Sequence, residues 1–121
     1  MCLNTVDEKT YKARVGYKVF ARPYNDRLRA VFRYHKIFHE GWNYDRQTGI
    51  ISEGEVSYPT GFHVYARLKD AQAVHPYSDI HKVILHKVVA SGTERFYHGG
   101  GFRLFRVYVA RSIYIHPEEE R

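Results

Sequence analysis

The chain has 121 residues, of which 44% are hydrophobic and 26% charged, so it is long enough for one hydrophobic core and too well supplied with apolar residues for intrinsic disorder. Nineteen Lys and Arg against thirteen Asp and Glu give a net charge of +6, which favours acidic partners such as nucleic acid, nucleotides or anionic protein surfaces. One cysteine excludes an internal disulfide, and because the N-terminus is polar and no apolar run reaches ~18 residues, we expect no signal peptide, no membrane span and a cytoplasmic protein.

Two segments near the N-terminus alternate in the manner of neighbouring β-strands. Residues 15–22 form the first, which Pro23 ends, and a turn at 24–26 leads into the second at 27–35. This arrangement predicts a β-hairpin. Three cations then project from one side of its second strand at steps of roughly 6.6 Å, namely Arg27, Arg29 and Arg33.

This cationic row is the first candidate site. Its spacing is close to that of phosphates along an extended nucleic-acid strand. With Arg22 nearby and Tyr24 beside it, the row could clamp phosphates while a ring stacks on a base. The alternative is a solvated sheet face whose arginines protect an edge against aggregation.

The middle of the chain contains a long connection followed by a compact unit. Between residues 36 and 60 the periodicity fades, which predicts an irregular connection with a short strand at 49–51. Residues 56–74, VSYPTGFHVYARLKDAQAV, then predict a turn, a short strand and a helix over 68–74. In that strand one side packs inward, while His63 and Tyr65 point together to the other side, either lining a cleft with the arginines or forming a corner that closes the core.

The C-terminal third predicts two long strands. The first covers residues 79–90 and ends at 91–93, and a glycine loop at 98–101 serves as a hairpin turn or an anion-binding nest. The second covers 102–116, and its length predicts a bulge or break near 110–112. The class is therefore α+β, a single domain over 1–121 with one short helix, a strongly bent and mostly antiparallel sheet, and peripheral segments at 1–12 and 117–121.

Other chemistry finds little support in the sequence. His35 and His39 share a face but lack the further ligands that zinc requires, so we predict no metal site and no cofactor. Cys2 would become an N-terminal nucleophile if Met1 were removed, although no oxyanion hole is evident. Carboxylates paired for acid–base work are confined to the connection, and we predict no catalytic residue.

Four segments resemble small uncharacterised proteins of phages and prophages. They are MCLNT, GYKVF, GFHVYARLKDA and a final strand ending in VYVARSIYI. The resemblance implies a phage protein that acts in the cytoplasm of a host cell, and it implies no activity.

A more distant likeness is to the ADP-ribosyltransferase fold. There a strand with a basic residue, a Gly-Phe segment followed by a helix, and a later glutamate enclose a nicotinamide dinucleotide. Arg22 would stand for the basic residue and Gly61-Phe62-His63 for the central segment, but the predicted strands at 79–90 and 102–116 contain no glutamate. The resemblance therefore implies nucleotide binding more readily than transferase activity.

We expect a non-enzymatic phage protein that binds a nucleotide signal or a nucleic acid and inhibits a bacterial defence system. One alternative is an ADP-ribosyltransferase-like enzyme acting on NAD, and another is an inhibitor that presents its basic surface to an acidic host protein. Exposed aromatic residues on a sheet are also compatible with a homodimer. The candidate ligand-binding residues are Arg22, Tyr24, Arg27, Arg29, Arg33, His63 and Tyr65.

Overall fold

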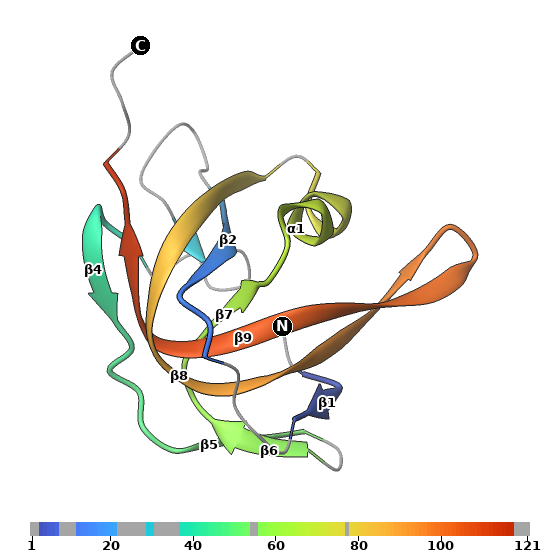
Figure 1. Ribbon diagram of the computed structural model, residues 1–121, viewed down its shortest axis with the longest axis horizontal. Coiled ribbons are helices and arrows are strands. Elements are labelled where there is room, and N and C mark those ends of the chain that lie inside the picture. Colours follow the sequence, from blue (N-terminus) through green and yellow to red (C-terminus); the bar gives the residue numbers. More distant parts are fainter. Residues whose placement is uncertain are drawn as a thin grey trace.

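A computed structural model describes residues 3–7, 12–21, 29–30, 37–53, 56–76 and 78–117 (Figure 1). The elements in chain order are β1 (Thr5–Val6), β2 (Val15–Ala21), β3 (Arg29–Ala30), β4 (Gly41–Tyr44), β5 (Ile50–Glu53), β6 (Val56–Pro59), β7 (Phe62–Tyr65), α1 (Leu68–Val74), β8 (Asp79–His98) and β9 (Gly101–Ile115). The predicted class, a bent and mostly antiparallel sheet with one short helix, is confirmed. In the part of the chain that the structure describes, no helix combines the length and apolarity needed to cross a membrane.

Two long strands organise the sheet. The strand order is β1-β8-β2-β7-β9-β4, with β3 beside β2, and β8 also pairs with β9, so that β8, β2, β7 and β9 form a closed circuit. Since β8 has 20 residues and β9 has 15, each strand pairs with different neighbours along its length. Figure 1 shows both strands bending through the body of the molecule and then leaving it together as a two-stranded ribbon at the right.

Alternation along the strands supplies two apolar clusters on opposite sides of the sheet. In β7, Phe62 and Val64 join the cluster that contains Phe20, whereas Tyr65 joins the cluster that contains Ala71 of α1. Every one of these side chains is at most 5% exposed. The prediction that Phe62 or Val64 packs inward is confirmed, and the opposite side of β7 is buried as well.

Residues 36–60 were predicted to be mostly irregular, and that prediction is wrong for the described part. Here β4 pairs with the end of β9, and β5 pairs with β6 as a separate hairpin. The predicted short strand at 49–51 is confirmed as β5. A four-residue strand such as β4 gives only a short local signal, because its stability comes from pairing with a distant strand.

The predicted strand end at 91–93 is also wrong, because β8 continues to His98. Gly92 lies where β1 pairs with β8, and a Cβ atom at this position would overlap the carbonyl oxygen of Thr5. This glycine therefore permits a close backbone approach instead of ending the strand. The hairpin turn at the next glycines is confirmed, since Gly99 and Gly100 have φ of 63° and 84° and join His98 to Gly101.

The predicted irregularity in the last strand lies in its partner instead. The β9 strand is continuous, whereas the β8 register shifts between Val88 and Ala90, with Lys87 at φ 55°. Such a bulge bends a strand and increases its twist. It allows the long hairpin to curve through the body of the sheet.

The predicted N-terminal hairpin is confirmed where the structure describes it. Ala21 pairs with Arg29 and Phe20 with Ala30 in antiparallel register. Residues 22–28 and 31–36 lie outside the described residues.

Candidate functional site

The β4 strand directs two aromatic side chains away from the core. Trp42 and Tyr44 are 39% and 64% exposed, whereas Asn43 between them is 5% exposed. The Asn43 side chain fixes the turn before the strand, because its amide donates to the His39 carbonyl at 2.8 Å and its oxygen accepts from the His39 backbone N–H at 3.1 Å. Gly41, at φ 90°, supplies the left-handed conformation that this turn requires. The two outward rings thus start from a fixed backbone.

Strand pairing extends these rings into a continuous surface. Trp42 lies opposite Tyr114 of β9, which lies opposite Ile84 of β8, which in turn lies opposite Val15 of β2. In the next row Tyr44 and His86 flank Ser112. We call this surface the outer aromatic face, and it consists of Val15, Trp42, Tyr44, Ile84, His86 and Tyr114.

Ring contacts hold Trp42 in place on this face. Its ring packs edge-on against Tyr114 with centroids 5.4 Å apart and against His86 at 6.1 Å. Tyr44 lies nearly parallel to Trp42, with centroids 6.5 Å apart and an interplanar angle of 27°. The pair therefore presents ordered ring faces to a flat ligand.

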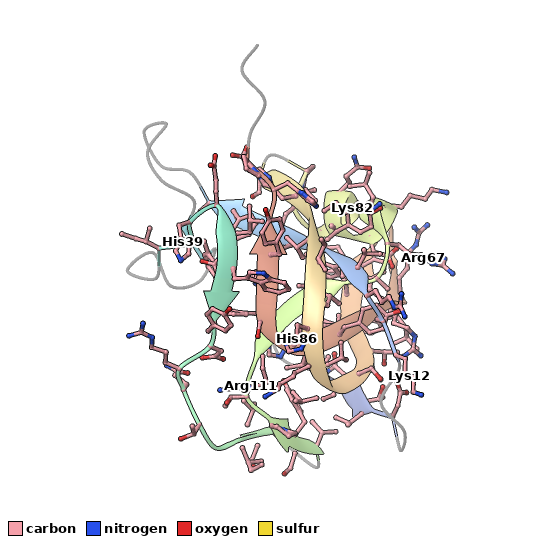
Figure 2. The ribbon with its side chains drawn as sticks, turned by 60° about the vertical axis from the view of Figure 1, so that its left-hand side comes forward. Lys12, His39, Arg67, Lys82, His86 and Arg111 are labelled. Carbon is pink, nitrogen blue, oxygen red and sulfur yellow. The ribbon has the colours of Figure 1, made fainter. Side chains whose placement is uncertain are left out.

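The charge around the outer aromatic face is cationic or titratable. Lys82 and His86 alternate along β8 and are exposed, and Figure 2 shows both on this strand. His116, also exposed, contacts the Tyr114 ring at 5.1 Å. None of the residues that form the two rows is acidic. An anionic ligand would thus meet little repulsion here.

Arg111, beside this face in Figure 2, has a structural role. Its guanidinium donates to the carbonyl oxygens of Asp45 at 2.6 Å and Thr60 at 2.8 Å, and to the Thr60 hydroxyl at 3.0 Å. The Asp45 carboxylate lies 3.7 Å away. Arg111 therefore ties the segment after β4 to the segment before β7.

His63 lies on the side of β7 that faces Tyr58. Its Nε2 is 2.9 Å from the Tyr58 hydroxyl, and that hydroxyl accepts a hydrogen bond from the Leu3 N–H at 3.1 Å. The Tyr58 proton is thus directed to a neutral imidazole. Burial, together with the positive charge of Lys18, lowers the pKa of His63 to about 3. His63 is consequently neutral at physiological pH.

Tyr65 points to the same side as His63, as predicted, but it is 1% exposed. Its hydroxyl donates to Glu94 Oε1 at 3.3 Å, and burial raises the pKa of both groups. The second carboxylate oxygen of Glu94 is buried without a hydrogen-bond partner among the described residues. In this arrangement Tyr65 contacts protein atoms and offers almost no surface to a ligand.

The remaining sequence-predicted residues cannot be placed in this geometry. Arg22, Tyr24, Arg27 and Arg33 lie outside the described residues, and Arg29 is described only by its backbone pairing with Ala21. Their convergence with His63 stays a prediction.

Sequence reasoning missed the outer aromatic face. It placed Trp42 and Tyr44 in an irregular connection over residues 36–60, although their alternation about Asn43 already contained a strand signal. Tyr114 and His86 belong to predicted strands, but only the pairing register brings them beside Trp42.

Among the described residues no three His, Cys, Asp or Glu side chains gather as a metal-ion site would require. Comparison with protein-family models, curated proteins and solved structures finds no match to this chain. Any functional argument therefore rests on the chain's own residues.

Proposed function

We propose that the protein binds a ligand that carries nucleobases and phosphates, with single-stranded nucleic acid as the form that best fits an open surface. The observation that carries the proposal is the exposed, nearly parallel Trp42–Tyr44 pair on a face without carboxylates. Bases stack on such rings whatever their sequence, and each stacked base contributes about 1–3 kcal/mol.

Two further features support this function. The edge-on contacts of Trp42 with Tyr114 and His86 order its ring before a ligand arrives, which lowers the entropic cost of binding. The net charge of +6 adds long-range attraction for a polyanion, and Lys82 on β8 places one of these positive charges in alternation with Ile84 and His86. The proposal keeps the ligand class expected from the sequence and moves the stacking surface away from Tyr65.

The biological setting of the proposal comes from the resemblance to phage proteins. In an infected cell, a small basic protein that sequesters a nucleotide signal or a nucleic-acid segment would inhibit a defence system that depends on it. Binding alone is sufficient for such inhibition, and no catalytic group is needed.

The decisive test compares two similarly exposed aromatic residues. Tyr44 on the outer aromatic face is 64% exposed, and Tyr97 on the ribbon is 62% exposed. Affinity for fluorescein-labelled oligothymidylate is measured by anisotropy for wild type, Trp42→Ala, Tyr44→Ala and Tyr97→Ala. We expect a loss of about tenfold or more at Trp42 and Tyr44 and no loss at Tyr97.

The same titrations with ATP and with duplex DNA distinguish the forms of ligand. Preference for the single strand supports a nucleic-acid ligand, and tighter binding of ATP supports a nucleotide. Equal affinities for the Trp42, Tyr44 and Tyr97 variants would contradict the proposal.

The ADP-ribosyltransferase-like alternative gains one observation. Because β8 runs to His98, it contains Glu94, and this carboxylate lies beside Tyr65 at the end of the Gly61–Tyr65 segment. A later strand therefore does carry a glutamate, which lies beyond the predicted range of 79–90. If this second function holds, incubation with NAD releases nicotinamide and Glu94→Gln abolishes the release. Release that is absent, or equal in both proteins, would exclude it.

A further inference from the structure

The root of the ribbon presents an open sheet edge. Toward the ribbon, the last hydrogen bond between the β7 segment and β9 is the one that the Ala66 N–H donates to the Arg106 carbonyl at 3.0 Å. Beyond it the chain turns into α1, which begins at Leu68, while β9 continues outward to Gly101 paired with β8 alone. One long side of β9 is therefore uncovered by any described strand (Figure 1).

Backbone alternation shows which groups face this edge. The Arg106 carbonyl points to the β7 side, and in an antiparallel ladder alternate residues point the same way. The N–H and C=O groups of Leu104 and Phe102 must then face the open edge, where no described residue pairs with them. They can exchange about four hydrogen bonds with an added strand.

A cationic groove runs along the same edge. Its volume is about 690 Å³, and its walls come from the start of α1, from Thr93 of β8 and from residues 103–106 of β9. Arg67 and Arg103 line it and are exposed, and within the described ranges neither guanidinium forms an ion pair. Asp70 lies between them, and burial raises the pKa of its carboxyl. Arg106, also in the wall, is 2.6 Å from Asp7.

The ribbon also exposes apolar side chains beside this groove. Phe102 and Leu104 are 65% and 62% exposed, and Tyr97 packs edge-on against Phe102 with centroids 5.2 Å apart. Arg95 covers part of the Phe102 ring at 5.2 Å. An added strand would therefore meet the guanidinium groups of Arg67 and Arg103 and the exposed apolar side chains of Phe102 and Leu104.

We propose that an extended acidic peptide of a partner protein adds as a strand to the open edge of β9. Its alternate side chains are acidic where they face Arg67 and Arg103, and apolar where they face Phe102 and Leu104. A second copy of the chain fits this edge poorly, because edge-to-edge pairing would bring arginines against arginines.

The probe is a fluorescein-labelled hexapeptide, Glu-Val-Asp-Leu-Glu-Val, titrated into the full chain and followed by anisotropy. Wild type is compared with the double variant Arg67→Ala/Arg103→Ala, with Leu104→Pro and with Asp70→Asn. Pro at position 104 removes an N–H aimed at the edge and leaves the β8 ladder intact. We expect the double variant and Leu104→Pro each to weaken binding about tenfold, and Asp70→Asn to strengthen it about threefold.

Two controls make the result specific. Arg46→Ala removes an exposed cation after β4 and should leave peptide affinity unchanged, as should Trp42→Ala on the outer aromatic face. A peptide N-methylated on the amides that face β9 should bind at least tenfold more weakly than one methylated on the intervening amides. Circular dichroism verifies that each variant folds.

Other results would overturn the proposal. These are no binding of the hexapeptide at millimolar concentration, equal binding of the two methylated peptides, or equal binding by a peptide with Lys in place of Asp and Glu. Concentration-dependent dimerisation that Leu104→Pro abolishes would assign the edge to a second copy instead.

Discussion

Glu94 is a partly buried carboxyl that the described contacts satisfy at one oxygen only. Its Oε2 has no hydrogen-bond partner among the described residues, and burial raises the pKa of the carboxyl from its ordinary value of 4.5. A carboxyl with a raised pKa stabilises the fold below its ordinary value, and this stabilisation is lost as the pH rises through the folded-state pKa. A buried carboxyl with a raised pKa and an unpaired oxygen is typical of functional positions.

Replacing this group tests the argument. Glu94→Gln keeps an acceptor for the Tyr65 hydroxyl and removes the titratable carboxyl whose pKa burial raises. We expect the free energy of unfolding at pH 7 to rise by about 1 kcal/mol, with a smaller change at pH 4, as measured by urea denaturation at both values. A destabilised variant at pH 7 would mean that an undescribed partner stabilises the charged carboxylate.

His63 gives the fold an acid-sensitive contact. Its pKa is about 3 in the folded protein, against an ordinary value of 6.5. Between these two values the unfolded chain binds a proton that the folded chain does not, so stability falls as the pH falls through this window.

The prediction at this residue is a change in pH dependence. The urea midpoint should drop more between pH 7 and pH 5 in wild type than in His63→Gln, whose amide does not titrate. His39→Gln, at an exposed loop position, provides the control and should follow wild type. An identical drop in all three proteins would assign the acid sensitivity to other groups.

At the scale of elements, the pairing of β1 with β8 depends on one glycine. A Cβ at Gly92 would overlap the Thr5 carbonyl, which belongs to the backbone and cannot rotate away. The Asp7–Arg106 ion pair and the bond from the Ser91 hydroxyl to Asp7 also depend on the position of this segment.

We therefore expect Gly92→Ala to lower the free energy of unfolding by about 3 kcal/mol. At Gly101 φ is not positive, and an added Cβ would have no atom within 4 Å. Gly101→Ala should therefore change the free energy of unfolding by no more than about 0.5 kcal/mol. Chemical denaturation of the two variants gives the comparison. Similar stabilities would mean that β1 does not pack against Gly92 in solution.

The same elements mark what a sequence can predict. The pattern in residues 15–21 and the start of the helix at Leu68 are local, and β2 and α1 were predicted with bounds within one residue. Gly92 was predicted as a strand end, because a glycine that permits a close approach of two strands has the same local signature as one that ends a strand. The bulge at Val88 and Ala90 was assigned to the wrong strand for a related reason: strand length shows that an irregularity is needed but does not show where it lies.

The candidate site depends on contacts that are distant in sequence. Trp42 meets Tyr114 and His86 only because β4 and β8 pair with opposite sides of β9. The residues next to Trp42 in the sequence do not indicate either of these strand pairings. A ligand class could be proposed from composition, since charge and aromatic content are properties of the whole chain, but the outer aromatic face could not be predicted from it.

At the scale of the whole molecule, the closed circuit separates the two proposed binding surfaces. The outer aromatic face lies over β4, β9, β8 and β2, and the open edge lies at the root of the ribbon, beyond β7. Figures 1 and 2 show the ribbon and β4 on different sides of the body. One protein could therefore hold a nucleic-acid ligand and a peptide at the same time, and variants at one surface should not affect the other.

The most direct measurement of the central claim uses intrinsic fluorescence, because Trp42 is the single tryptophan in the chain. Titration with unlabelled oligothymidylate should quench its emission, and the affinity should fall about tenfold between 50 and 200 mM salt. Oligonucleotide binding that leaves Trp42 emission unchanged, or no binding at 50 mM salt, would contradict the account.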